Sequence, residues 1–440
     1  MNQPATPLSS PATSVTGWIL LSLLVLALIA ALTQAIPGYI AGIPAWAAAA
    51  VLCRQQKRNQ MIQSAILFII GVLGLIIGLF SGVDHRYLLK ALEANQLVIA
   101  MLIGVSFLRL VAANNIRCNE QLPLGRKAML HTLFGSHLIS AVINMSTVMI
   151  VGDRLSSKQP LTPLQGLTLL RAFSLCAVWS PFFASMGVIL ISAPGSQLGT
   201  LMLFGLPVAL IGLLLSSWQL ARHPEVTTTQ GYPMHFKALW MPLLLAILVM
   251  LAHWRWPTLP VMTLVTLISV LFVLTYLATK QRSNGVRLLT QHINEGLPKL
   301  GSEITLFLAA AVMAAGVAAL LESLQIRLAP EHFTAPEACL TLLALVGLAL
   351  IGMHPVTTAV LAGSILMPSV SDPNLLAITL LLSWSIGVGV SPFSGVQLSL
   401  QSRYGISSLT LMKFNRYYSP TMLTVGFAAI WLYSAIAEIA

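Results

Sequence analysis

A polar pattern occurs twice in this chain, and its two copies stand 211 residues apart. Ser146-Thr147 is followed 34 residues later by Ser180-Pro181-Phe182, and Thr357-Thr358 is followed 34 residues later by Ser391-Pro392-Phe393. Each copy interrupts segments that are otherwise apolar. Polar groups and helix breaks are costly inside a lipid bilayer, so they persist where they line a cavity or pack against protein. A duplicated break of this kind is typical of secondary transporters built from inverted repeats.

The composition indicates a membrane protein. Of the 440 residues, 57% are hydrophobic and 8% are charged, whereas about a quarter of the residues in a soluble domain are charged. We therefore expect a chain that crosses the lipid bilayer several times. The net charge of +11 comes from basic residues in short loops between apolar runs. Membrane orientation explains such loops, so we expect no nucleic-acid partner.

The apolar segments predict an all-α protein with about eleven transmembrane helices. Residues 1–16 are uncharged and rich in Pro, Ser and Thr, so we expect them to be disordered. One helix over 17–53 would be ~55 Å long against a hydrocarbon core of ~30 Å. Pro37-Gly38 therefore divides this run into a first transmembrane helix at 17–35 and a second at 39–53. The other predicted spans are 61–83, 95–113, 166–193, 200–220, 238–254, 259–279, 304–323, 374–401 and 419–437.

Two further apolar segments predict re-entrant hairpins. Segment 128–152 has Arg126-Lys127 before it and Arg154 after it. Basic residues favour the cytoplasm, so both of its ends should lie there. Segment 338–368 would be ~46 Å long as one helix, but Pro355 interrupts it. Its flanks are acidic, and we expect it to enter the membrane from the opposite side.

These segments divide into two inverted-topology repeats. The expected parts are a first repeat at 39–220 with hairpin 128–152 and broken helix 166–193, a cytoplasmic linker at 221–237, and a second repeat at 238–437 with hairpin 338–368 and broken helix 374–401. The basic loops place the N-terminus in the cytoplasm and the C-terminus in the periplasm. The expected location is the inner membrane of a bacterium.

The two hairpin tips are the predicted solute site. A half-helix that ends within the membrane leaves N–H or C=O groups unpaired, and N-terminal ends favour anions. We expect a small anionic organic solute to bind between the tips, near the middle of the membrane. The candidate ligands are Asn144, Ser146, Thr147, His354, Thr357 and Thr358.

The serines beside the two Ser-Pro-Phe breaks are the predicted ion site. Helix C-terminal carbonyls favour cations, and neutral carbonyl and hydroxyl oxygens suit a hard cation such as Na⁺. The candidate ion ligands are Ser180, Ser185, Ser391 and Ser394. Na⁺ is the expected coupling ion, with H⁺ as the alternative because His354 could titrate.

Each of these residues also has a purely structural interpretation. Serine and threonine in membrane helices commonly bond their own backbone or tighten helix packing. His354 could bond a loose carbonyl, and His137 is expected to be a satisfied interior histidine. We expect Asp153-Arg154 to form a local ion pair at the surface.

The chain contains no Walker motif, nucleophile elbow, GxGxxG or metal-ligating helix. Nucleotide hydrolysis is thereby disfavoured, so an ion gradient or the gradient of the solute would drive transport. We predict that the protein is not an enzyme and has no catalytic residue, no metal site and no cofactor apart from the coupling ion.

Over roughly residues 17–437 this plan resembles the ion transporter superfamily, in particular the divalent anion/sodium symporters. Those proteins have eleven spans, two oppositely entering hairpins and two interrupted helices that meet the hairpin tips. Their tips read Ser-Asn-Thr, whereas this chain has Asn144-Met145-Ser146-Thr147 and Pro355-Val356-Thr357-Thr358, so only the hydroxyl character carries over. The resemblance implies a homodimer in which the hairpin-bearing part moves as an elevator.

Other functions fit the same sequence. A lipid or polyprenyl-phosphate flippase and a metabolite or drug exporter could use the same scaffold, because sequence gives neither the solute nor the direction of transport. An integral-membrane enzyme would need an acid, base or metal cluster at one membrane face. The nine histidines are too scattered along the chain to supply one.

Overall fold

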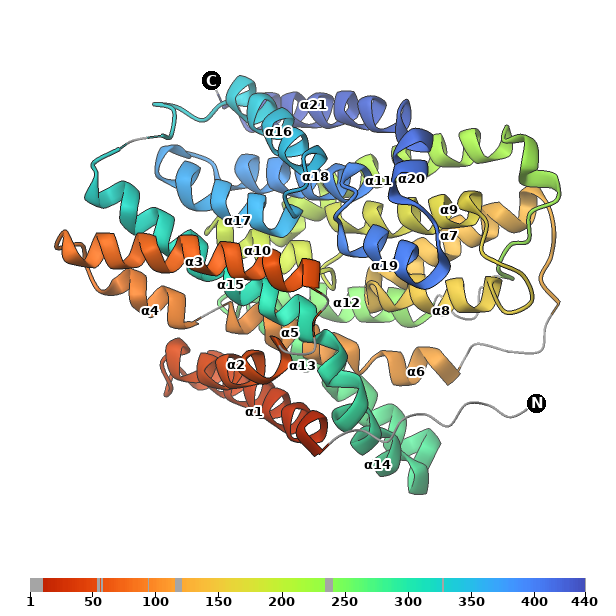
Figure 1. Ribbon diagram of the computed structural model, residues 1–440, viewed down its shortest axis with the longest axis horizontal. Coiled ribbons are helices and arrows are strands. Elements are labelled where there is room, and N and C mark those ends of the chain that lie inside the picture. The colour runs from red at the N-terminus through yellow and green to blue at the C-terminus, as the bar shows by residue number, and fades with distance from the viewer. Residues whose placement is uncertain are drawn as a thin grey trace. The chain divides into compact units, whose positions relative to one another are not determined.

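A computed structural model describes residues 11–439, except 54–55, 57, 94, 115–120, 234–239 and 327 (Figure 1). Over these residues the protein is helical and has no β-strand, apart from an isolated bridge between Leu124 and Gln230. Eight helices in this part of the chain are long and apolar enough to cross a membrane. The predicted class, an all-α multi-pass membrane protein, is therefore confirmed.

The chain forms two compact units. The first unit is Met1–Val111 with Trp256–Ile326, and the second is Ala112–Arg255 with Arg327–Ala440. Each unit joins two segments that are distant from each other in the sequence. The compact units are thus a different division of the chain from the two predicted repeats.

The first unit is built mainly from eight helices. They are α1 (Pro11–Thr33), α2 (Gly38–Leu52), α3 (Arg58–Phe80), α4 (Arg86–Glu93), α5 (Gln96–Ser106), α13 (Val261–Tyr276), α14 (Arg282–Gln291) and α15 (Gly301–Ser323). The short helix α6 (Arg109–Asn114) crosses the boundary between the units.

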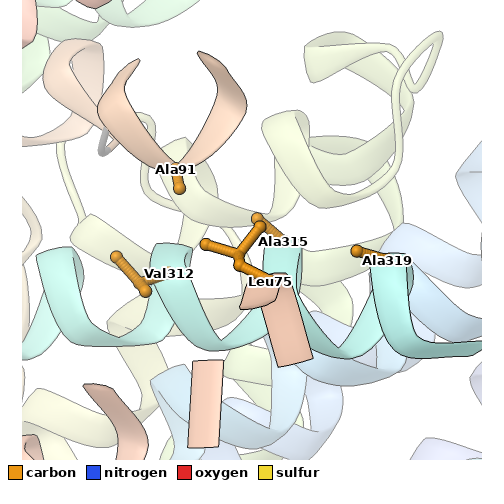
Figure 2. Close-up of a cluster of buried hydrophobic side chains, with 5 residues drawn as sticks. All are labelled: Leu75, Ala91, Val312, Ala315 and Ala319. Carbon is orange, nitrogen blue, oxygen red and sulfur yellow. The ribbon is translucent and has the colours of Figure 1, made fainter. Parts of the chain in front are cut away.

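Glycines bring α3 and α15 into close contact. A Cβ on Gly71 would lie 2.5 Å from the backbone of Val312, and one on Gly316 would lie 1.9 Å from the carbonyl oxygen of Gly71. Small residues let membrane helices approach closely, so dispersion contacts can hold the helices together. A small apolar cluster surrounds this contact and takes in α4 as well (Figure 2). Its buried members are Leu75, Ala91, Val312, Ala315 and Ala319.

One prediction for the first unit is wrong in part. Residues 11–16 belong to α1, although they were expected to be disordered. Pro11 suits a first helical position, Ser14 Oγ donates to Asn294 Oδ1 at 2.8 Å, and the Thr16 side chain is fully buried. The rest of that predicted disordered segment, 1–10, lies outside the described residues.

The basic segment 280–300, which separates the predicted spans 259–279 and 304–323, is helical. It contains α14 and a π-helical turn (His292–Gly296). His292 and Ile293 are 7% and 3% exposed. Packing of these two side chains therefore stabilises a helix that its polar composition alone does not favour.

The second unit contains the remaining helices. From Ala112–Arg255 these are α7 (Arg126–Ile143), α8 (Ser146–Leu155), α9 (Pro163–Ser174) with a 3₁₀ turn (Leu175–Val178), α10 (Ala184–Ser192), α11 (Leu198–Ala221) and α12 (Trp240–Arg255). From Arg327–Ala440 they are α16 (Ala335–Leu350), α17 (Pro355–Leu366), α18 (Pro373–Val390), α19 (Gly395–Tyr404), α20 (Ser408–Asn415) and α21 (Tyr418–Ile436). Of the predicted linker, residues 234–237 lie outside the described part of the chain.

Helix boundaries in the second unit repeat at the same offset as the sequence pattern. α8 ends at Leu155 and α17 at Leu366, while α10 begins at Ala184 and α19 at Gly395. In both cases the second position follows the first by 211 residues. The order of short helix pair, interrupted helix and long helix therefore occurs twice within one compact unit.

Candidate functional site

The first predicted tip is a helix interruption at Asn144. α7 ends at Ile143 and α8 begins at Ser146, with Asn144 between them at φ 52°. A positive φ is uncommon for a residue other than glycine, and with ψ at −137° Asn144 ends α7 where no proline or glycine is present. Asn144 Nδ2 donates to the carbonyl oxygen of Phe182 at 3.0 Å. The tip is thereby joined to the first Ser-Pro-Phe break.

At this first break, serine hydroxyls replace missing backbone partners. The 3₁₀ turn that continues α9 ends at Val178, and α10 begins at Ala184. Ser180 Oγ donates to the carbonyl oxygen of Ala141 and accepts from the Phe182 N–H, the latter at 3.2 Å. Ser185 Oγ donates to the carbonyl oxygen of Ala177 at 2.7 Å. Both predicted ion ligands therefore already have structural bonds.

The second predicted tip lies between α16 and α17. Gly352 has φ 110°, and a Cβ there would lie 2.9 Å from the ring of Phe393 in the second break. His354 caps α17, because its Nδ1 accepts from the Val356 N–H at 3.2 Å. Pro355 occupies the first helical position, which its fixed φ suits. This tip, like the first, packs against its own Ser-Pro-Phe break.

The hydrogen bonds of the second break match those of the first in part. Ser391 Oγ accepts from the Phe393 N–H at 3.3 Å, as Ser180 Oγ does from Phe182. Ser394 Oγ donates to the carbonyl oxygen of Val388 at 3.0 Å. Val388 stands 211 residues after Ala177, the acceptor in the first break. The acceptor position is thus duplicated, although Ser394 corresponds to Phe183 and not to Ser185.

Three oxygens at the two tips are buried without a hydrogen-bond partner in the described part of the chain. They are Asn144 Oδ1, Thr147 Oγ1 and Thr357 Oγ1. Thr147 and Thr357 are 1% and 2% exposed. A buried polar atom without a partner costs about 1–3 kcal/mol, so such atoms call for a bound group or water. Ser146 is half-buried at the start of α8.

The structure distinguishes the two neighbouring threonines of the second tip. Thr358 stands 211 residues after Thr147 and is its sequence equivalent. Its Oγ1, however, donates to the carbonyl oxygen of Pro355 at 3.1 Å, within its own helix. The unpaired hydroxyl of the second tip therefore belongs to Thr357, one residue from the position that the repeat indicates.

Arg171 is a buried cation that the sequence analysis did not consider. It lies in α9 and is 1% exposed. Its Nε donates to Asn415 Oδ1 at 3.0 Å, and its guanidinium carbon lies 4.1 Å from the centre of the Tyr418 ring. Asn415 Nδ2 donates in turn to the carbonyl oxygen of Gly389 at 2.9 Å, just before the second break. A charged residue inside an apolar run is a functional signal by default, and it could have identified this position.

One prediction about another polar residue is confirmed. His137 is a satisfied interior histidine, as predicted, because Trp179 Nε1 donates to its Nε2 at 3.1 Å and its Nδ1 lies 2.9 Å from the carbonyl oxygen of Ala172. An indole N–H only donates, so the proton of neutral His137 is on Nδ1. Asp153 forms a two-pronged ion pair with Arg403, at 2.7 and 2.6 Å, which joins the ends of α8 and α19.

No protein-family model matches this chain, and no curated protein matches its sequence significantly. Its function is therefore inferred from the residues of the second unit.

Proposed function

We propose that this protein is an ion-coupled secondary active transporter of a small anionic organic solute. The solute would bind between the two tips of the second unit, and the protein would carry out no covalent chemistry. The observation that carries the proposal is the set of unpaired buried oxygens at Asn144, Thr147 and Thr357. They lie at two helix interruptions that occupy corresponding places in the two copies of the sequence pattern.

The helix ends at the tips suit the two charges that such a transporter handles. α8 and α17 begin at the tips, so their first N–H groups and the positive ends of their dipoles favour an anion. The hydroxyl and amide oxygens beside them are neutral hard ligands, which fits Na⁺. His354 keeps H⁺ as the alternative coupling ion.

In this proposal the two helix pairs α7–α8 and α16–α17 are re-entrant hairpins among about eleven spans. Support comes from Ser385 Oγ, which donates to the carbonyl oxygen of Ser174 at 2.8 Å across a separation of 211 residues. Equivalent residues meet each other near a two-fold axis. This contact therefore favours repeats related by a two-fold rotation.

The resemblance to divalent anion/sodium symporters is part of the proposal. The second unit holds both tips and both breaks in one compact body, which is the body that an elevator mechanism would move. A homodimer in a bacterial inner membrane, with the N-terminus cytoplasmic and the C-terminus periplasmic, completes the proposed arrangement.

The proposal is tested with purified protein in proteoliposomes on a solid-supported membrane. We expect transport currents from at least one small carboxylate, phosphate or sulfonate, larger in Na⁺ than in choline. Empty vesicles of the same lipids are the control. Currents equal to those of empty vesicles over the whole panel would count against a transporter of small anions.

The same vesicles address the flippase and exporter alternatives. A flippase would accelerate the transfer of a fluorescent phospholipid between leaflets, which a solute transporter leaves unchanged. An exporter would accumulate solute inside the vesicles when the gradient of the coupling ion is reversed.

A further inference from the structure

An open groove of about 280 Å³ lies in the second unit among α16, α18, α20 and α21. Its apolar lining comes from all four helices and consists of Leu343, Val346, Gly347, Leu350, Val390, Met412, Pro420 and Leu423. Its polar lining is limited to Asn415, Arg416 and Ser419, at the junction of α20 and α21. The ten residues predicted for the solute and ion sites are not part of the lining, so this groove is a separate feature.

The lining has the chemistry of an amphiphile site. Apolar surface facing water is unfavourable, so a groove of this kind on a membrane protein is expected to hold hydrocarbon. Arg416 is exposed, and its guanidinium carbon lies 4.7 Å from the centre of the Tyr417 ring. The hydroxyl of Ser419, one helical turn further on, adds a donor for an anionic oxygen. Basic residues between membrane helices are complementary to anionic lipid headgroups.

We propose that this groove binds one anionic phospholipid. An acyl chain would lie along α16 and α21, and the phosphodiester would meet Arg416 and Ser419. The chain would touch Val390, the last residue of α18 before the second break. It would also touch Asn415, whose side chain bonds both Arg171 and the carbonyl oxygen of Gly389. The bound lipid would thus support the helix end from which the second break begins.

A larger side chain at position 347 can fill the groove without clashing with the backbone. A Cβ added at Gly347 would meet no atom within 4 Å, so the ring of Gly347→Phe should occupy the groove. The control is Gly199→Phe, because a Cβ at exposed Gly199 also meets no atom within 4 Å and this residue does not line the groove.

The measurement is native mass spectrometry of the full purified chain, with phosphatidylglycerol and phosphatidylcholine added in equal amounts. We expect the wild-type protein and Gly199→Phe to retain phosphatidylglycerol in preference, and Gly347→Phe to lose most of it. Retention of phosphatidylglycerol by Gly347→Phe would overturn the proposal. A wild-type dimer that retains no phosphatidylglycerol would also overturn the proposal, because a second copy of the chain would then cover the groove.

Arg416→Gln tests the contribution of the positive charge at the groove separately from that of the groove's volume. Loss of one cation beside a phosphate should reduce the preference for phosphatidylglycerol over phosphatidylcholine about fivefold. Arg287→Gln, the same change at an exposed arginine outside the lining, should keep the full preference. An unchanged preference in Arg416→Gln, or equal retention of both lipids by the wild-type protein, would show bulk lipid only and overturn the proposal. These readouts measure binding, so they are independent of whether the protein transports an anion.

Discussion

At the scale of single residues, Thr357 and Thr358 form a matched pair for testing the site. Both are 2% exposed, but Thr357 Oγ1 is unpaired while Thr358 Oγ1 bonds Pro355. If Thr357 binds solute or ion, Thr357→Val should weaken apparent affinity 5- to 30-fold, because a lost ligand costs about 1–2 kcal/mol. Thr358→Val loses a bond within its own helix and should keep near-normal affinity, with about 0.6 kcal/mol of lost stability.

Uptake kinetics and thermal unfolding midpoints of both variants check this prediction. A purely structural role predicts the reverse for Thr357→Val, since removal of an unpaired buried hydroxyl should raise the unfolding midpoint and leave affinity unchanged. Thr147→Val should behave like Thr357→Val, because its hydroxyl is unpaired at the first tip.

A substitution at His354 distinguishes the two candidate coupling ions, Na⁺ and H⁺. Its Nδ1 accepts a backbone hydrogen bond only while that nitrogen is unprotonated. Histidine ordinarily titrates between about pH 5 and 8, so His-mediated H⁺ coupling gives a pH dependence that His354→Asn should abolish. Asparagine is a good helix cap, so α17 should remain intact. Under Na⁺ coupling, the Na⁺ dependence of uptake in this variant should match that of the wild-type protein. If His354→Asn abolished the Na⁺ dependence of uptake, the hypothesis that Na⁺ couples to transport independently of His354 would be wrong.

At the scale of helices, Asn415 connects three elements through Arg171 and Gly389. Asn415→Leu keeps the approximate size but leaves a buried cation and a carbonyl without this partner, which should cost about 3 kcal/mol. Thr379→Val in α18 is the control, because Thr379 Oγ1 bonds only the Leu375 carbonyl of its own helix. Thermal unfolding of the purified variants measures the difference. Equal midpoints would show that the connection adds little to stability.

The positions of the helix breaks were predictable because their causes are local. Pro181, Pro355 and Pro392 each remove a backbone donor, and this effect can be read directly from sequence. The break at Asn144 has no proline and was predicted from the basic residues that flank its segment. The helix through 280–300 was not predictable in this way, because its support comes from buried His292 and Ile293 and not from an apolar pattern.

The finer chemistry of the candidate site depends on packing that one sequence does not contain. Sequence equivalence pairs Thr147 with Thr358, whereas side-chain orientation leaves Thr357 unpaired. Asp153 pairs with Arg403, 250 residues away, and no local sequence pattern indicates this contact. Both outcomes follow from tertiary contacts.

At the scale of the whole molecule, the proposed topology predicts which surfaces water-soluble reagents reach. In a variant without native cysteines, Asn284→Cys should resist a membrane-impermeant maleimide added to sealed cells, because the proposed topology places its basic segment in the cytoplasm. Glu331→Cys, in the acidic segment expected outside, should react. Both residues are exposed, so burial would not explain protection. Labelling of position 284 or protection of position 331 would contradict the proposed orientation.

The contact between Ser174 and Ser385 bears on how such a chain arises. Two separate, identical half-length chains could form it with each other across their symmetry axis. Arg171 precedes Ser174 by three residues, and its equivalent, Leu382, precedes Ser385 by three. In an ancestral pair of identical chains, one buried arginine would have implied a second one at the corresponding place. If the two copies arose by duplication and fusion, they could diverge within one chain, so that one keeps the buried Arg171 while the other has Leu382.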